Sequence, residues 1–181
     1  MTNIARLRCN PPLASPLELK RLLVETLSER RYAFFITADL HGPRTFDPIR
    51  DRLREWRNRV NRYYGGRRAV SPHRRARRMD GLVFFERGAL RNSPHVHLVL
   101  DAPKLAEPTD FPLTAAAIWS SQYPAPTQII RPYRAVTSGG KMQVDRIRDS
   151  PDDTARVLHY VLKETERPHP DAEPFVHIED I

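Results

Sequence analysis

The chain is short of cysteine, of lysine and of long apolar runs. Its single cysteine, Cys9, cannot form an internal disulfide, and no cysteine pair is present to build a zinc knuckle. Any bound metal must therefore use histidine and carboxylate ligands. No window approaches the roughly 18 apolar residues of a membrane span, and the N-terminus "MTNIARLRCNPPLASP" lacks the apolar segment of a signal peptide. These absences predict a cytoplasmic protein that has no membrane partner.

Arginine supplies almost all of the positive charge. Lys+Arg total 30 and Asp+Glu total 22, which leaves a net charge of +8, and only four of the 30 are lysines. The planar guanidinium group suits phosphate, so this composition favours nucleic-acid partners. The densest run, "GGRRAVSPHRRARR" from Gly65 to Arg78, is predicted to be a loop. It is either a solvated surface loop or a nucleic-acid contact made by Arg67, Arg68, Arg74, Arg75, Arg77 and Arg78.

Hydrophobic spacing and turn residues predict an α+β fold. Apolar side chains recur at helical intervals in residues 15–31, 46–66, 112–123 and 149–168. Runs rich in β-branched and aromatic residues predict strands within residues 32–40, 79–88, 95–103 and 134–147, the last with a Gly-Gly turn. This order favours a mostly antiparallel sheet that has helices packed on one face and leaves the other face open.

The length of 181 residues suits one compact domain with a real core. We expect an N-terminal helical extension over residues 1–31 and a main domain over residues 32–167. The tail, residues 168–181, is predicted to be loosely ordered apart from a short strand at "PFVHI".

Two histidines bracket the first valine of "NSPHVHLVL", residues 92–100. In a strand, residues i and i+2 share a face with their Cα atoms about 7 Å apart, so His95 and His97 can converge on one ion while the apolar alternates enter the core. Glu86, in the preceding candidate strand, would lie beside them if the two strands form a hairpin. Two imidazoles and one carboxylate suit Mg, Mn, Zn or Fe. The alternative is that all three are ordinary polar side chains of a strand.

A tyrosine flanked by cations lies on the last predicted helix. One stripe of this helix is apolar, and a second face carries, at i, i+4, i+7 and i+11, Arg156, Tyr160, Lys163 and Arg167. Tyr160 is either a side chain at the core edge with its hydroxyl in water or a nucleophile toward a phosphodiester. In the second case a metal would polarise the phosphate and Lys163 would offset developing negative charge. Arg156 is a further candidate for phosphate contact.

Three short motifs, in this order, resemble those of the HUH endonucleases, which include rolling-circle replication initiators, relaxases and single-tyrosine transposases. "FFITADL" is similar to the family's first motif, "HVH" to its His-hydrophobic-His motif and "YVLK" to its Tyr-x-x-Lys motif. The matching segments run from about Tyr32 to Arg167. The resemblance implies a five-stranded antiparallel sheet of ferredoxin-like or RRM-like type, with the tyrosine helix beside a divalent ion.

Carried over to this sequence, the resemblance gives each site residue a role. It implies that His95, His97 and Glu86 bind Mg or Mn, that Tyr160 attacks the DNA and that Lys163 assists. The family reaction nicks single-stranded or hairpin DNA and leaves a 5′-phosphotyrosine and a free 3′-OH, which can prime synthesis or later rejoin the strand. The implied function is that of a plasmid or phage rolling-circle replication initiator.

Two departures narrow this resemblance. No second tyrosine lies one turn from Tyr160, which argues against the two-tyrosine initiators. No ATPase module is indicated, because "SGGKM" lacks the spacing of a phosphate loop, so no nucleotide cofactor is expected. The expected partners are therefore single-stranded or hairpin DNA and a host helicase.

Other functions stay open on the sequence. A single-tyrosine transposase or a mobilisation relaxase would use the same residues. A non-catalytic module could bind single-stranded nucleic acid through arginines and exposed aromatics such as Phe35 or Phe85. A cupin-like metal enzyme would pair the histidines with Asp101, but cupins need more short strands than this chain offers. Tyr63 and Tyr64 are further nucleophile candidates, although neither has a lysine three residues on.

Overall fold

The computed structural model describes residues 15–30, 32–40, 45–87, 94–122, 128–131, 134–137, 140–163 and 175–181. Its α-helices are α1 (Pro16–Ser28), α2 (Asp47–Gly65), α3 (Phe111–Ser120) and α4 (Pro151–Val161), and its 3₁₀ helices are η2 (Arg67–Val70), η3 (Pro72–Arg77) and η5 (Ile178–Asp180). Its strands are β1 (Phe34–Leu40), β2 (Asp80–Arg87), β3 (Pro94–Asp101), β4 (Gln128–Arg131), β5 (Arg134–Thr137), β6 (Gly140–Arg146) and β7 (Phe175–His177). No helix in this described part is both long and apolar enough to cross a membrane.

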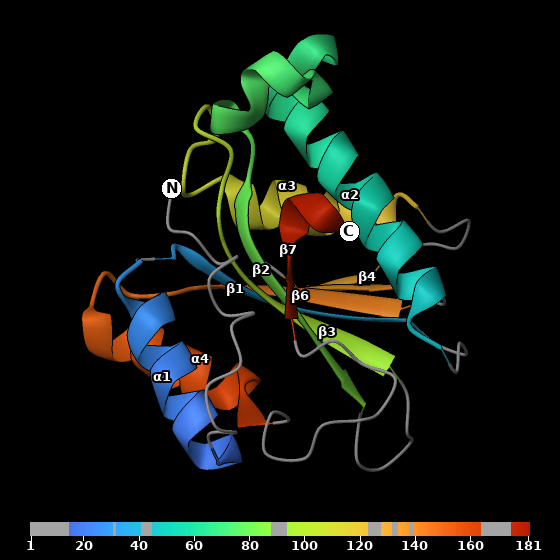
Figure 1. Cartoon of the computed structure of the whole chain (residues 1–181). Coiled ribbons are helices and arrows are strands. Elements are labelled where there is room, and N and C mark those ends of the chain that lie inside the picture. Colours follow the sequence, from blue (N-terminus) through green and yellow to red (C-terminus); the bar gives the residue numbers. More distant parts are fainter. Residues whose placement is uncertain are drawn as a thin grey trace.

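One antiparallel sheet organises these elements (Figure 1). The strands lie in the order β4-β5-β6-β1-β3-β2-β7, and each neighbouring pair is antiparallel. A five-stranded centre, from β5 to β2, carries the four-residue β4 and the three-residue β7 at its edges. The predicted α+β class with a five-stranded antiparallel sheet is therefore confirmed. Strand β4 was not predicted from the sequence.

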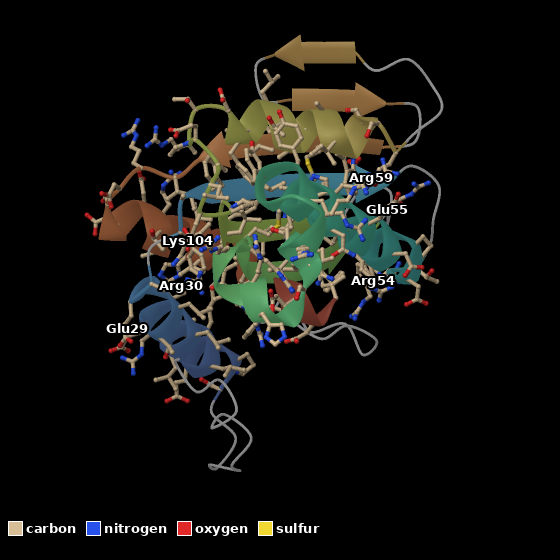
Figure 2. The ribbon with its side chains drawn as sticks, turned by 90° about the horizontal axis from the view of Figure 1, so that it is seen from above. Glu29, Arg30, Arg54, Glu55, Arg59 and Lys104 are labelled. Carbon is tan, nitrogen blue, oxygen red and sulfur yellow. The ribbon has the colours of Figure 1, made fainter. Side chains whose placement is uncertain are left out.

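The first face of the sheet lies under α2 and α3. Strand side chains alternate between faces, and this face carries an apolar set that is almost completely buried: Phe34, Ile36, Ala38, Val83, Phe85, Val96, Leu98 and Leu100. The buried Trp56 of α2 donates a hydrogen bond from Nε1 to the carbonyl of Ala115 in α3, at 2.9 Å. The outer side of α2 carries exposed ion pairs, such as Arg59 with Glu55 at 2.5 Å (Figure 2). The apolar residues of α2 recur at helical spacing, so one side of the helix packs on the sheet and the charged side faces solvent.

The second face of the sheet is not open along its whole length, which corrects the prediction that helices cover one face only. It carries Leu82, Phe84 and Val99, and these side chains form a second core with the apolar sides of α1 and α4. The apolar stripe predicted on α4 is confirmed, with Leu158, Val161 and Leu162 buried. Apolar strand residues on both faces require cover on both faces, so α1 and α4 shield this region and leave the neighbouring part of the second face for polar groups.

The basic run and the C-terminal residues are also more ordered than predicted. The run forms the 3₁₀ helices η2 and η3 rather than a loop. In the tail, the predicted short strand is β7, which pairs with β2. Ile178 and Ile181 belong to the first-face core, with 1% and 7% of their surface exposed. The apolar residues after β7 therefore fix the described end of the chain to the domain, which the prediction of a loose tail did not anticipate.

Replacing Ile178 with alanine tests this docking. Removing a fully buried isoleucine side chain leaves a cavity, and we expect the Ile178→Ala variant to lose about 2–5 kcal/mol of unfolding free energy. Urea unfolding followed by circular dichroism measures the change. Leu113→Ala, on the outer side of α3 where the side chain is 49% exposed, is the matched control and should change stability by less than about 0.5 kcal/mol. Equal effects in the two variants would contradict the docking of Ile178.

Candidate metal and tyrosine site

The three predicted metal ligands come together on the second face of the sheet. Glu86 of β2 lies directly opposite His95 of β3 in the antiparallel register. Residues that face each other across two strands share a face, and His97 is two residues further along β3, so its side chain emerges on the same side. The hairpin predicted from the sequence is the element that brings the carboxylate to the imidazoles. Its apolar alternates lie in the first-face core and hold the pair of strands in place.

The geometry of these ligands suits a single small cation. His95 Nε2 lies 3.3 Å from Glu86 Oε1, and His97 Nε2 lies 3.1 Å from Glu86 Oε2. One ligand atom from each residue can be chosen so that all three lie within 4.8 Å of one another. Glu86 and His97 are buried and His95 is partly exposed. The three side chains could therefore hold a metal ion, and a set of two nitrogens and one carboxylate is compatible with several divalent metals.

Thr37 is a supporting residue that the sequence analysis did not single out. It lies opposite His97 in the β1–β3 register, and its Oγ1 is 3.0 Å from His97 Nδ1. A hydrogen bond on one ring nitrogen fixes the orientation of an imidazole and leaves the other nitrogen for a ligand. Here that other nitrogen, Nε2, faces Glu86. The only signal for Thr37 in the sequence was its place in "FFITADL", which resembles the first motif of the family. That motif did not reveal the contact with His97.

Helix α4 brings Tyr160 and the residue just beyond its end, Lys163, to the same place. The Tyr160 ring lies edge-on to His97 and Phe35, with ring centroids 5.2 and 6.0 Å away, and 48% of the residue is exposed. Lys163 Nζ forms an ion pair with Glu86 Oε1 at 2.9 Å and lies 4.1 Å from the centre of the Tyr160 ring. All five residues predicted for the metal and catalytic roles are thus in one cluster, with a phenol partly open to solvent.

The charges of this cluster depend on one another. Burial raises the pKa of the Glu86 carboxyl, but hydrogen bonds from His95, His97 and Lys163 outweigh it and hold the pKa well below its usual range. Burial lowers the pKa of His97, so this imidazole favours its neutral form. The Lys163 pKa is lowered by burial but raised by more through the contact with Glu86. An ionised carboxylate beside a neutral imidazole is the protonation state that metal ligands require.

The predicted nucleic-acid-binding arginines do not all lie on one free surface. The guanidinium of Arg78 donates to the carbonyls of Ala69 and Ser71 and pairs with Glu179, so it stabilises the 3₁₀ helices. Arg75 also pairs with Glu179, and on α4 Arg156 pairs with Asp153. The exposed arginines of the basic run are Arg67, Arg68, Arg74, Arg75 and Arg77, and of these Arg75 is the one that pairs with Glu179.

These exposed arginines are remote from the metal ligands. The 3₁₀ helices precede the start of β2 at Asp80, whereas Glu86 lies six residues further along this strand, about 20 Å away at 3.3 Å per residue. Figure 1 shows the helical turns of η2 and η3, in green at the top, at the opposite end of the molecule from the end of β2. These arginines and the cluster around Glu86 therefore lie on separate parts of the surface.

Several alternative interpretations lose their geometric basis. Asp101, which a cupin-like site would need, is at the other end of β3 and binds Arg30 at 2.9 Å. Phe85 is buried in the first-face core and cannot stack on a nucleobase. Tyr63 and Tyr64 end α2 and pack against each other, outside the cluster of Glu86 and the histidines. Arg167 lies outside the described residues.

Comparison with protein-family models, with curated protein sequences and with solved structures found no match.

Titration with Mn²⁺ tests the metal site. We expect the protein to bind one equivalent, and Glu86→Gln to weaken the affinity by at least about tenfold, because the variant loses the anionic ligand. Isothermal titration calorimetry measures both values. Glu55→Gln, on the exposed side of α2, removes the same charge far from the site and should leave the affinity unchanged. Similar losses in the two variants would show that Mn²⁺ binds elsewhere.

Proposed function

We propose that this protein is an HUH-type endonuclease that nicks and joins single-stranded DNA through a 5′-phosphotyrosine, and that it serves as a plasmid or phage rolling-circle replication initiator. The observation that carries the proposal is the convergence of a half-exposed phenol, an ammonium group and a metal-compatible triad. A protein that only binds nucleic acid has no need for all three in one place. Transposition or mobilisation would use the same chemistry on a different DNA element.

Each residue of the cluster has a role in this reaction. Glu86, His95 and His97 would hold Mg or Mn, which when bound polarises the non-bridging oxygens of a phosphodiester. Tyr160 is 48% exposed, so a DNA strand would have access to it. A neutral phenol is a weak nucleophile and needs nearby positive charge. Lys163, held above the Tyr160 ring by Glu86, supplies that charge and stabilises the negative charge that develops in the transition state.

The proposed chemical step is a transesterification. The bond between Tyr160 Oη and phosphorus forms while the bond between phosphorus and the 3′ oxygen of the preceding nucleotide breaks. The phenol loses its proton to solvent, and the departing 3′ oxygen gains one. One phosphate ester replaces another, so no ATP is consumed and the free 3′-OH can reverse the reaction. The requirement for a strand whose backbone reaches the Tyr160 hydroxyl favours single-stranded DNA or the loop of a hairpin.

The exposed arginines of η2 and η3 fit a second, sequence-independent contact. Arg67, Arg68, Arg74 and Arg77 would bind phosphates of a DNA segment outside the cleavage site and so add to affinity without entering the chemistry.

A covalent-adduct assay tests the proposal. The protein is incubated with labelled single-stranded and hairpin DNAs, including sequences from its own genomic neighbourhood, in Mn²⁺ or in EDTA, and is run on denaturing gels. We expect a Mn²⁺-dependent covalent protein–DNA band that Tyr160→Phe abolishes, because the variant lacks the attacking oxygen.

Tyr63→Phe is the matched control, since Tyr63 is 67% exposed and lies outside the cluster; it should form the adduct as the unmodified protein does. An adduct that survives Tyr160→Phe would assign the nucleophile elsewhere. If no DNA gives an adduct and binding persists through His95→Ala and Tyr160→Phe, the protein is a binding module instead.

A further inference from the structure

The polar row that contains His95 continues across the sheet beyond the metal ligands. In the β1–β3 register His95 lies opposite Asp39, and in the β1–β6 register Asp39 lies opposite Lys141. Residues that oppose each other across neighbouring strands share a face. Lys141, Asp39, His95 and Glu86 therefore form one row on the second face, perpendicular to the strands. This row lies on the part of the second face that α1 and α4 leave free for polar groups.

Asp39 holds Lys141 in place by two contacts. Its Oδ2 is 3.1 Å from Lys141 Nζ, and its Oδ1 accepts a hydrogen bond from the Lys141 backbone N–H at 2.9 Å. The Lys141 side chain is 42% exposed, whereas that of Asp39 is 17% exposed. The ammonium group is thus oriented by a largely covered carboxylate and still reaches solvent. Such an arrangement reduces the conformational freedom that a surface lysine would otherwise lose on binding an anion.

One lysine lies at each end of this row, with the metal ligands between them. Lys163 contacts Glu86 at the β2 end of the row, and Lys141 is two strands beyond His95, about 10 Å between Cα atoms at 4.8 Å per strand. The triad therefore lies between two ammonium groups. On β6 the other residues that face this side are Gln143 and Asp145, and Gln143 Nε2 donates to Asp145 Oδ2 at 2.8 Å. Among these three β6 residues, the positive charge comes from Lys141.

We propose that Lys141 binds a phosphate of the same single strand that Tyr160 attacks, next to the scissile phosphate, so that the strand crosses the sheet from α4 toward β6. This inference depends on the proposed function, because it needs a DNA strand at Tyr160. Lys141 is a positioning residue. It contacts a phosphate that does not react, and a compact ammonium group with three donors suits a single phosphate oxygen. The contact would set where the backbone enters the site without reading a base.

The first test measures the salt dependence of binding. The adduct-forming oligonucleotide is bound in EDTA to the 181-residue chain carrying Tyr160→Phe, and fluorescence anisotropy gives the affinity at several salt concentrations. Each phosphate contact on a single strand contributes about 0.7 to the slope of log affinity against log salt. We expect Lys141→Met to reduce the slope by about that amount, whereas Lys141→Arg keeps it.

Arg59→Met is the matched control. Arg59, like Lys141, is a partly exposed cation paired with a carboxylate, here Glu55 at 2.5 Å, but it lies on the outer side of α2 (Figure 2), and its replacement should leave the slope unchanged. Circular dichroism of the Lys141 variants excludes unfolding as the cause of any loss.

The second test identifies the phosphate. A series of oligonucleotides, each with one uncharged methylphosphonate linkage, is bound to the Tyr160→Phe protein with and without Lys141→Met. We expect one linkage beside the scissile position to weaken binding severalfold when Lys141 is present and to have no effect in Lys141→Met. Insensitivity of the slope to Lys141→Met, or the same methylphosphonate profile in both proteins, would overturn the inference even though the adduct forms. If no DNA forms an adduct, the proposed function fails first and the inference fails with it.

Discussion

The ionised carboxylate of Glu86 is the group around which this structure is built. A buried negative charge is costly unless it is paired and hydrogen-bonded. Here it is hydrogen-bonded by His95 and His97 on the neighbouring strand and ion-paired with Lys163 just after α4. The same contacts fix the end of α4 against the sheet and place Tyr160 above His97. One electrostatic requirement therefore positions the candidate nucleophile, its assisting cation and the metal ligands together.

Much of this site was predictable because its signals are local. The alternation of "HVHLVL" places His95 and His97 on one face, and the short connection between two candidate strands brings Glu86 beside them. The spacing of Tyr160 and Lys163 on an amphipathic helix was equally readable. That Tyr160 and Lys163 would lie beside the triad was predicted only from the resemblance of three motifs, in order, to those of a known family. No local pattern specifies where a helix docks.

The features that sequence reasoning missed depend on long-range pairing. The cover that α1 and α4 give to the second face follows from Leu82, Phe84 and Val99, which a strand pattern alone assigns to either side. Arg75 and Arg78 form ion pairs with Glu179, which is about a hundred residues away in the sequence. Their structural role could not be predicted without knowing that Glu179 packs beside η3. The row from Lys141 to Glu86 joins four strands, and its registers cannot be derived from the spacing within any one of them.

The β2–β3 hairpin carries apolar side chains on one face and the polar groups of the site on the other. This difference strongly favours one register between the two strands. If β3 paired with β2 one residue out of register, every β3 side chain would move to the opposite face. His95 and His97 would then enter the apolar core beneath α2 and α3, and Glu86 would keep a buried charge without its imidazole partners. The mispaired chain would suffer both penalties at once. The polar groups of the site therefore favour the correct strand register, because a chain that pairs β2 and β3 out of register forms neither the apolar core nor the cluster around Glu86.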